Sequence, residues 1–518
     1  MSTFLTSLEQ VLSAEHRPVL FDHDTWHSTS ELRNDVLRVK QALWNAGLRE
    51  RDEVLLGLPN SYEFAVVYLA LLQSGIVVAP VNPKIPAAEL ERVMTRLDAK
   101  AVIGSQVQAD AWNPVLCQRG FDSNLNVAIS PAGTAGTSLP IVVSLAPLRL
   151  SQTTESAPGT AGDDDAPAVL MFTSGTTGKP KGVLLRRRHL LHAVNNVILS
   201  HQLTEFDVAY CILPLFHINA QVIVLLSTLL SGGRLVMVDR FHASRFWDDV
   251  TTHRVTWVSA VPTILSILSK QQSKTHRTHY LRFIRSASAP LSPAIKTRFE
   301  CSVGVPVVES YGMTEAAGQI CINPLPPAVR KAGSVGKPFG LELEILNDEK
   351  HPVGPNHVGE IVIRGQNVIE AYAGAEGQHA DSRWDGWIFT GDLGYRDDDG
   401  YVFITGRAKE IINRAGEKLS PREIEDVLSG HPSVDRSAVI GVPDPLYGER
   451  VVAFVVPVDY EVGGKGALVH ELAQMCKNSL ANHKCPAEIV VARSLPVGPT
   501  GKVQKHLLRD AQTLHLLA

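Results

Sequence analysis

EVLLGLPNSYEFAVVYLALLQSGIVVAPV, residues 53–81, has the clearest secondary-structure pattern in the chain. Glu53–Leu58 is a short apolar run typical of a buried strand, and Ile76–Val81 is a second run of the same kind. Between them, Ser61–Gly75 has the length and pattern of a helix, with Asn60 as its candidate N-cap and Gly75 at its end. A strand, a helix and a strand in this order predict a parallel βαβ unit.

The same rhythm continues on the C-terminal side. Ala87–Leu97 has helical spacing, and the next strand begins at residues 100–103. Residues 340–365 and 387–404 carry short alternating runs and Gly turns, which predict β structure. After them, residues 407–518 show strands and helices of their own, including a helix at Pro421–Ser429. The sequence therefore predicts an α/β protein with a large domain at 1–406, including a β-rich part, and a small α+β domain at 407–518.

Composition excludes several classes of function. The 518 residues are 44% hydrophobic and 20% charged, which is ordinary for a globular protein, and 49 Lys and Arg against 53 Asp and Glu give a net charge of −4. Without a basic excess, nucleic acid is not an expected partner. The six cysteines include no C-x-x-C pair, which favours a reducing compartment. The most apolar window, Val222–Leu230, is far shorter than the roughly 20 residues of a membrane span. We expect a cytoplasmic protein with no membrane span.

The sharpest local signal is TSGTTGKPKG at Thr173–Gly182, directly after an apolar run. Its glycines allow backbone N–H groups to converge on an anion, and its hydroxyls and lysines add donors and charge. A Walker A loop needs four residues between its glycines and a Ser or Thr after its lysine. Here Gly175 and Gly178 enclose only two residues, and Pro180 follows Lys179. The pattern predicts a phosphate-binding loop outside the P-loop class.

This decapeptide resembles the phosphate loop of the adenylate-forming superfamily, which includes acyl-CoA and aryl-CoA synthetases. Further motifs of that superfamily follow in its order: Tyr311–Glu315 (YGMTE), Gly333–Pro338 (GSVGKP), Trp387–Asp392 (WIFTGD), Gly406–Lys409 (GRAK), Glu417–Glu425 (EKLSPREIE) and Pro499–Lys505 (PTGKVQK). The resemblance covers roughly residues 30 to 510. It implies a large nucleotide-binding domain followed by a small mobile domain that carries a catalytic lysine.

The resemblance implies that ATP activates a carboxylic acid as acyl-AMP with release of pyrophosphate. Both reactants are anions, so cations must cancel their repulsion. Lys502 matches the lysine that bridges the substrate carboxylate and the α-phosphate. Glu315 matches a Mg²⁺ ligand, with Thr176 as a second candidate, and Thr314 would donate its hydroxyl to the α-phosphate. The matching phosphate-loop residues are Thr173, Ser174, Gly175, Thr176, Thr177, Gly178 and Lys181.

The resemblance also assigns the nucleoside. Asp392 and Arg407 would hold the ribose, and Tyr311 would stack near the adenine. The family more often has Gly where Ser288 stands, so this sequence keeps a small residue with a side chain there. The remaining residues implied for the nucleotide pocket are Ser288, Ala289, Pro290, Gly312, Met313 and Ile404.

Two further sites concern the small domain. Lys409 falls at the family's hinge, about which the small domain rotates between the two half-reactions. Gly416 and Glu417 would face coenzyme A in the second half-reaction. The segment departs from the more usual Gly-Gly-Glu by having Ala415, which concerns how closely the pantetheine arm approaches.

The identity of the acid is the least specified feature. Leu213–Gln221 (LPLFHINAQ) matches the motif at the acyl end of the pocket, and His217 matches the ring that closes on the carboxylate in CoA ligases of the family. The implied pocket residues are His217, Asn219, Gln221, Val261, Gly312 and Met313. No acidic residue lies between Pro214 and Leu230, which argues against an α-amino acid. An aliphatic, aryl or betaine acid stays open, including the carnitine/crotonobetaine-CoA ligase-like branch and the medium-chain acyl or aryl branch.

The expected function is that of an AMP-forming acid–thiol ligase that uses ATP, Mg²⁺ and coenzyme A. The alternative is an acyl-AMP ligase that passes the acyl group to a separate carrier protein or an amine. A module that binds nucleotide without turnover is disfavoured, because Glu315, Asp392, Arg407 and Lys502 are all present. The oligomeric state is open, with a homodimer as one alternative.

Overall fold

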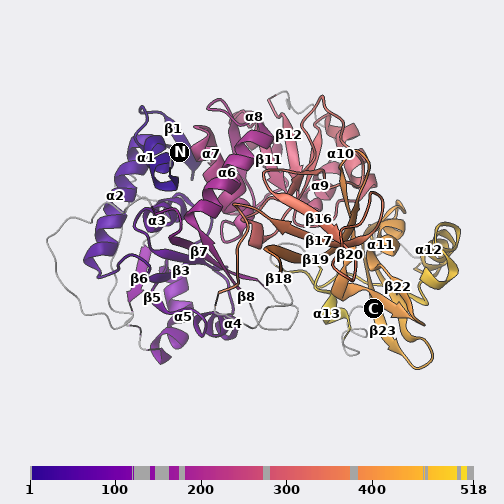
Figure 1. Ribbon diagram of the computed structural model, residues 1–518. Helices are drawn as coiled ribbons and strands as arrows, with labels where there is room; N and C mark the ends of the chain where they lie inside the picture. The colour runs from indigo at the N-terminus through magenta and orange to yellow at the C-terminus, as the bar shows by residue number, and fades with distance from the viewer. Residues whose placement is uncertain are drawn as a thin grey trace.

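The computed structural model describes residues 3–119, 121, 141–145, 163–173, 181–271, 280–373, 383–458, 460, 465–498 and 503–509. The strands within these ranges form four sheets. The α/β prediction is confirmed: a large N-terminal domain precedes a smaller C-terminal one, which is orange to yellow in Figure 1.

The predicted βαβ unit lies in a six-stranded sheet. The strands in spatial order are β6 (Ile141–Leu145), β5 (Ala99–Ser105), β3 (Glu53–Gly57), β4 (Val77–Pro80), β7 (Pro167–Thr173) and β8 (Lys181–Arg186). The four central strands are parallel, and β6 and β8 run antiparallel to their neighbours. The helix of the unit is α3 (Tyr62–Gln73), and its N-cap is Ser61, whose Oγ accepts a hydrogen bond from the backbone N–H of Phe64 at 3.2 Å. Asn60 as the N-cap was therefore wrong by one residue.

A nine-stranded sheet forms the second layer of the large domain. In spatial order its strands are β15 (Lys337–Pro338), β14 (Cys321–Ile322), β13 (Val307–Tyr311), β12 (Phe283–Ser286), β11 (Trp257–Ala260), β9 (Val208–Cys211), β10 (Arg234–Met237), β1 (Pro18–Asp22) and β2 (Thr25–Ser28). The run from β13 to β1 is parallel. Ligands of open parallel sheets bind beyond the carboxyl ends of the strands. A site is therefore expected at the carboxyl ends of these strands.

Buried helices join the two sheets. Every residue of α3 from Tyr62 to Leu72 is buried, as is η1 (Asn219–Leu226, a π-helical segment) from Ala220 to Leu226. One continuous apolar core contains α3, η1 and residues of both sheets. Because a helix that is apolar on all faces must be covered on all faces, these two helices belong inside the layered domain.

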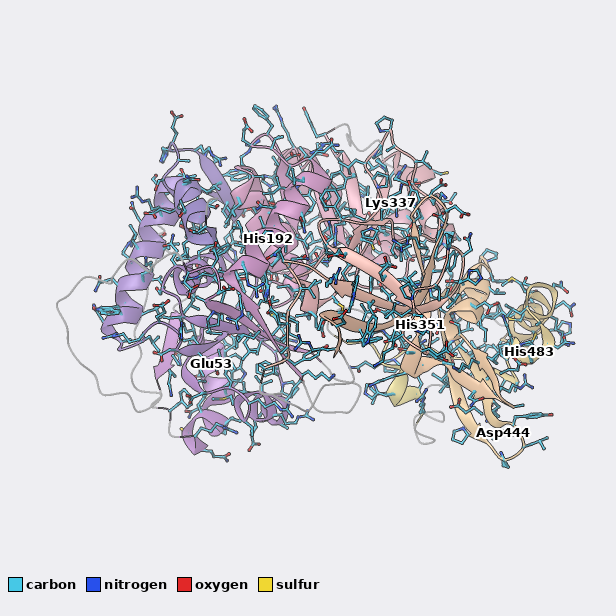
Figure 2. The ribbon with its side chains drawn as sticks, viewed as in Figure 1. Glu53, His192, Lys337, His351, Asp444 and His483 are labelled. Atoms are coloured by element: carbon cyan, nitrogen blue, oxygen red, sulfur yellow. The ribbon has the colours of Figure 1, made fainter. Side chains whose placement is uncertain are left out.

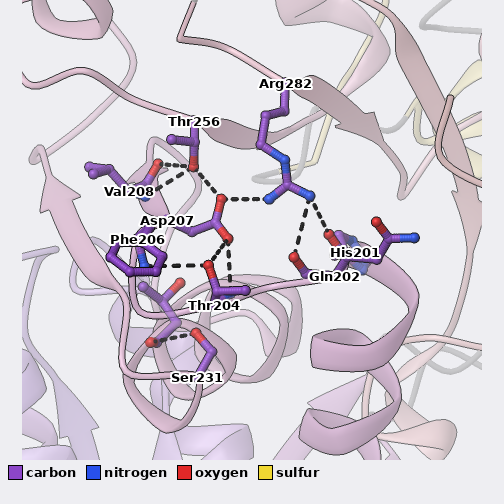
Figure 3. Close-up of polar contacts among 10 residues, drawn as sticks. His201, Gln202, Thr204, Phe206, Asp207, Val208, Ser231, Thr256 and Arg282 are labelled. Atoms are coloured by element: carbon purple, nitrogen blue, oxygen red, sulfur yellow. Dashed lines mark hydrogen bonds and ion pairs between the residues drawn. The ribbon is translucent and has the colours of Figure 1, made fainter.

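A polar cluster fastens helix α6 (Arg187–His201) to the nine-stranded sheet (Figure 3). Arg282 forms an ion pair with the buried Asp207 at 2.5 Å, and its other guanidinium nitrogen donates to the carbonyl oxygens of His201 and Gln202 at 3.0 and 3.3 Å. Asp207 also accepts from the hydroxyl of Thr256 at 2.7 Å. The last carbonyls of the helix thus gain a cationic donor, as helix C-termini favour.

Two smaller sheets complete the described chain. The β-rich part predicted at residues 340–404 contains β16 (Glu342–Leu346), β17 (Gly359–Arg364), β18 (Arg383–Trp384), β19 (Trp387–Arg396) and β20 (Val402–Arg407). The C-terminal domain contains β21 (Ile412–Arg414), β22 (Glu417–Leu419), β23 (Val434–Asp444), β24 (Gly448–Pro457) and β25 (Glu488–Val491), with α11 (Pro421–Ser429), α12 (Lys465–Ser479) and α13 (Lys505–Leu508).

The remaining helices surround the sheets. They are α1 (Phe4–Leu12), α2 (Thr29–Asn45), α4 (Ala87–Met94), α5 (Gln106–Gln118), α7 (Ser227–Leu230), α8 (Phe246–Thr252), α9 (Pro262–Ser269), α10 (Pro293–Val303) and the short turns η2 (Thr314–Ala316), η4 (Ala408–Glu410) and η5 (Asn482–Lys484). Within the described ranges, no helix is long and apolar enough to cross a bilayer.

Candidate active site

Tyr311, Asp392 and Arg407 come from three different strands and meet in one cluster. Asp392 on β19 and Arg407 on β20 are direct cross-strand partners, and their side chains form an ion pair at 2.8 Å. The Tyr311 hydroxyl, at the end of β13, donates to the other carboxylate oxygen of Asp392 at 2.5 Å. Asp392 is only 4% exposed. The β-rich part thus brings a carboxylate and a guanidinium to the carboxyl end of β13 in the nine-stranded sheet.

A second cluster surrounds Glu315. Its carboxylate, in the short turn η2, is 8% exposed and accepts a hydrogen bond from the Tyr372 hydroxyl at 2.9 Å. Burial raises the pKa of Glu315, and the Tyr372 hydroxyl and the nearby cations Arg407 and Lys181 oppose that rise. The Lys181 ammonium lies 4.7 Å from the centre of the Tyr372 ring. No sequence motif indicated Tyr372, because it reaches the cluster through the fold.

The predicted phosphate loop falls between β7 and β8 in the sequence. These strands pair antiparallel, with Thr173 opposite Lys181, so the two ends of the loop lie side by side. Ser174, Gly175, Thr176, Thr177 and Gly178 lie outside the described residues, and only the backbone of Thr173 is described. Residues 499–502, which include Lys502, are also outside them, and on either side of this gap Val497 and Val503 form an antiparallel bridge.

The segment Ser288–Ala289–Pro290 follows β12 and carries an unusual backbone. Ser288 has a φ of 71°, the left-handed region that glycine adopts most readily. This backbone conformation is the one that the expected Gly would adopt without strain. The side chain that this sequence adds is used: the Asn219 amide donates to the Ser288 hydroxyl at 3.4 Å, and Asn219 accepts from the Ser259 hydroxyl at 3.0 Å.

Gly312 has no room for a side chain. A Cβ on Gly312 would lie 1.5 Å from the carbonyl oxygen of Gly318, so any side chain there would displace the backbone after η2. Its neighbours Met313 and Thr314 are half-buried, as is Ile404 on β20, and Met313 and Ile404 pack against the same apolar cluster as Tyr311. Val261, the N-cap of α9, is half-buried against the main core.

His217 stands in a loop that Asn60 holds. The Asn60 amide donates to the carbonyls of Leu213 and Val238 at 2.9 and 3.2 Å and accepts from the N–H of Leu215 at 2.7 Å. Burial lowers the pKa of His217 to about 4, so the ring is neutral at pH 7. Its Nε2 is buried without a hydrogen-bond partner among the described residues.

Gln221, one of the residues expected at the acyl pocket, lies behind the His217 loop. Gln221 is fully buried within η1. Its amide donates to the Leu215 carbonyl at 2.8 Å, and its oxygen accepts from the Tyr68 hydroxyl at 3.2 Å. Both ends of the amide are therefore engaged by the protein, and the residue supports the His217 loop from below.

The residues assigned to the hinge and to coenzyme A lie on the surface. Lys409 is exposed in η4, directly after β20. Gly416 and Glu417 are exposed in the β21–β22 turn, where Ala415 has a φ of 54° and Gly416 a φ of 88°. The β23–β24 hairpin tip lies next to this turn: the N–H of Ala415 donates to the carbonyl of Tyr447 at 2.8 Å, and Asp444, labelled in Figure 2, accepts from the N–H groups of Leu446 and Tyr447.

Comparison with known proteins gives consistent matches that include both the N-terminal and the C-terminal part of the chain. The model of the AMP-binding enzyme family matches residues 8–373, and the model of its C-terminal domain matches residues 423–502. A sulfoacetate–CoA ligase of Cupriavidus necator is 38% identical over 94% of each chain, and an oxalate–CoA ligase of Arabidopsis thaliana is 37% identical over 90% of this chain and 89% of the relative. The crystal structure of ATP-bound MatB from Rhodopseudomonas palustris superimposes with a TM-score of 0.85 at 27% identity, over 98% of both chains.

Proposed function

We propose that this chain, which belongs to the family of AMP-binding enzymes, converts a small carboxylic acid into its coenzyme A thioester. The protein is an AMP-forming acid–thiol ligase. The carboxylate and ATP first form acyl-AMP and pyrophosphate, and the thiol of coenzyme A then takes the acyl group and releases AMP. The observation that carries this function is the 38% identity to a named CoA ligase over 94% of the chain, which includes both domains.

The nucleotide end of the site would be formed by the cluster around Asp392. We assign the ribose hydroxyls to Asp392 and Arg407, whose ion pair already holds the carboxylate in place. Tyr311 fixes the second oxygen of Asp392 from the adenine side. The backbone of Ser288, Ala289 and Pro290 would border the base, with Gly312, Met313 and Ile404 completing the pocket.

The phosphate end would be formed around Glu315. A buried carboxylate beside the Lys181 ammonium is a hard oxygen donor of the kind that Mg²⁺ prefers. We assign the metal to Glu315 and Thr176, and when bound it would neutralise charge on the ATP phosphates. Thr314 and the loop Thr173, Ser174, Gly175, Thr176, Thr177, Gly178 and Lys181 would supply donors to the phosphates.

Lys502 is our candidate for the cation that brings the carboxylate to the α-phosphate. Two anions approach one another in this step, so an ammonium between them stabilises the charge of the transition state. We propose a domain boundary at residues 406/407, with Lys409 as the hinge. Rotation of the small domain about this hinge would move Lys502 away from the substrate. The face that carries Gly416 and Glu417 would then turn toward the substrate for the transfer to coenzyme A.

The acyl end would be formed by the residues His217, Asn219, Gln221, Val261, Gly312 and Met313, with the buried Gln221 amide supporting the His217 loop. Because burial keeps the His217 ring neutral, it can close on the substrate as a hydrogen-bonding group and not as a fixed charge. Asn219 would be a polar group of this pocket, and its side-chain oxygen accepts a hydrogen bond from Ser259 on β11 of the nine-stranded sheet.

We further propose a cytoplasmic location without a nucleic-acid partner, which the six free thiols and the net charge of −4 support. The named relatives are CoA ligases, which favours coenzyme A over a carrier protein or an amine as acceptor. A homodimer is a proposal that size measurements in solution would test.

The function is tested by incubating the protein with ATP, Mg²⁺ and a panel of carboxylic acids, with and without coenzyme A. We expect AMP release that requires one of the acids and increases with coenzyme A, together with the matching acyl-CoA. In a parallel assay, Lys502→Ala should lose acyl-AMP formation but still transfer preformed acyl-AMP to coenzyme A. Pyrophosphate exchange that never responds to coenzyme A would contradict the acid–thiol ligase and indicate a carrier protein or an amine as acceptor.

A further inference from the structure

Arg285 is a buried cation at the centre of the nine-stranded sheet. It lies on β12 and is only 1% exposed. One guanidinium nitrogen donates to the Ser259 hydroxyl on β11 at 3.2 Å, and the other donates to the Ser310 hydroxyl on β13 at 2.9 Å. The Nε–H is buried without an acceptor among the described residues, and no described carboxylate forms an ion pair with this side chain.

The lack of a carboxylate distinguishes Arg285 from its neighbours. Arg282, three residues earlier, is paired with Asp207 at 2.5 Å, as Figure 3 shows. The buried Lys296 is paired with Glu309 at 2.8 Å. Burial lowers the pKa of Arg285 to about 9, which leaves the side chain cationic at neutral pH. A charge kept in the interior without a counter-ion costs several kcal/mol, and two neutral hydroxyls offset only part of this cost.

The position of Arg285 connects this cation to the acyl pocket. Ser259, which accepts from Arg285, donates to the Asn219 oxygen at 3.0 Å, and the Asn219 amide reaches the Ser288 hydroxyl at 3.4 Å. Asn219 is partly exposed. The group therefore forms a polar path from the partly exposed Asn219 to the buried guanidinium, at the carboxyl ends of β11 and β12, where parallel sheets bind their ligands.

We propose that Arg285 is the specificity-determining residue of the acyl pocket and binds a second anionic group of the substrate. The acid is then a small dianion, either a dicarboxylate or a sulfocarboxylate, with one carboxylate directed to the α-phosphate and the other acidic group directed to Arg285. Ser259, Ser310 and Asn219 position the guanidinium for this contact. The inference rests on the proposed function, since it concerns the acyl pocket of the same ligase.

The physical consequence is discrimination against monoanionic acids. A substrate that ends in a methyl group would leave the guanidinium buried and unpaired, and sites built around a buried polar group reject analogues that lack its partner. A dianion gains a charge-assisted, two-point contact that arginine provides with carboxylate or sulfonate oxygens.

The test compares acids matched in length that differ by one anionic group: malonate and sulfoacetate against propionate, and succinate against butyrate. Acyl-CoA formation is measured at saturating ATP and coenzyme A for the wild type, Arg285→Met and Arg285→Lys. We expect the wild type to prefer a dianion. Arg285→Met should lose kcat/KM for that acid on the order of 100-fold through KM, with propionate or butyrate unchanged or improved. Arg285→Lys should retain part of the preference.

A stability measurement separates specificity from a structural role. Replacing an uncompensated buried charge by an apolar side chain is often neutral or stabilising, so Arg285→Met without ligand should melt at or above the wild-type temperature. Arg282→Met is the matched control on the same segment: it leaves Asp207 buried and unpaired, and should lower the melting temperature without changing the ratio of malonate to propionate turnover.

The outcomes also separate this inference from the proposed function. If no acid of the panel yields acyl-CoA with the wild type, the proposed function fails. Wild-type activity that does not distinguish dianions from monoanions, or a preference that Arg285→Met preserves, would overturn the role of Arg285 while the ligase function stands. A lower melting temperature of Arg285→Met with an unchanged acid preference would identify the residue as a structural link between strands.

Discussion

At the scale of single residues, the proposed nucleotide end of the site contains one buried carboxylate with two partners. Asp392 accepts from Tyr311 on one oxygen and pairs with Arg407 on the other. A carboxylate fixed from two sides loses little rotational freedom when it binds a ribose diol. Under the proposed ribose assignment, the charge and the geometry of Asp392 therefore both matter for ATP binding.

Replacing Asp392 by Asn keeps the shape and removes the charge. The partly exposed Arg407 would lose its ion-pair partner, and the proposed ribose hydroxyls would lose a charged acceptor. A hydrogen bond to a charged group contributes about 1.5–3 kcal/mol, so the KM for ATP should rise roughly 10-fold or more. The matched control is Glu342→Gln, which breaks an exposed ion pair with Arg364 on the same sheet and should leave the KM unchanged. Equal KM values for Asp392→Asn and the wild type would contradict the ribose assignment.

Tyr372→Phe removes only the hydroxyl oxygen of this side chain and tests the proposed phosphate end of the site. The Tyr372 hydroxyl is a donor to the Glu315 carboxylate, and hydrogen bonds to charged groups contribute about 1.5–3 kcal/mol. We expect acyl-AMP formation to need more Mg²⁺ and to slow by roughly 10-fold or more at fixed Mg²⁺. Pyrophosphate exchange measured against Mg²⁺ concentration checks this, with Tyr395→Phe as the control on β19. An unchanged Mg²⁺ requirement would contradict the proposed role of Tyr372 at the metal site.

The sequence predicted the residues that belong to motifs and missed those that reach the site through packing. Tyr311, Glu315, Asp392 and Arg407 stand in motifs, and the structure brings them to one sheet edge. Tyr372 has no flanking pattern, because only the fold places its hydroxyl beside Glu315. Motif analysis does not identify Arg285 for the same reason. Only the fold shows that no carboxylate among the described residues pairs with this side chain.

At the scale of elements, the periodicity of hydrophobic residues predicted helices and strands well where it extended over many residues. The helix at Pro421–Ser429 was found with its bounds, and the strand–helix–strand unit at residues 53–81 was confirmed. The N-cap of α3 was assigned to Asn60 instead of Ser61, because both residue types cap helices and only the fold shows that Asn60 is engaged by the His217 loop. Sequence patterns did not show the burial of Gln221, because only the fold places its amide in the core within the π-helical segment η1.

The β21–β22 turn provides a prediction at this scale. Ala415 has a φ of 54°, which costs an alanine about 1 kcal/mol relative to glycine. Ala415→Gly should therefore slow amide hydrogen exchange in β21 and β22 by up to about 5-fold. Ala473→Gly, in the middle of helix α12, is the matched control and should accelerate exchange in its own helix. Faster exchange in the turn of Ala415→Gly would contradict the strain at this position.

At the scale of the whole molecule, buried histidines make the large domain sensitive to acid. Burial lowers the pKa of His217 to about 4 and that of the fully buried His201 well below its usual value. Unfolded histidine takes up a proton near pH 6.5. Between this pH and the folded pKa, the unfolded state binds more protons, so stability falls as the pH falls through that window.

The expected size of this effect can be measured. His217 alone should remove about 2 kcal/mol of stability between pH 7.5 and pH 5, seen as a lower melting temperature of the large domain. His217→Gln should show a shallower dependence on pH, whereas His470→Gln, at an exposed position of α12, should retain the wild-type slope. Identical slopes for His217→Gln and the wild type would contradict a neutral, buried His217.

The most direct test of the ligase is the fate of the carboxylate oxygen. The acid with the highest turnover is labelled with ¹⁸O in its carboxylate and converted with ATP and coenzyme A, and the AMP, pyrophosphate and phosphate are then analysed by mass spectrometry. If the carboxylate attacks the α-phosphate, one labelled oxygen remains on AMP after the thiol displaces it from the acyl group. Label in inorganic phosphate, with ADP as the nucleotide product, would show attack at the γ-phosphate and contradict acyl-AMP as the intermediate.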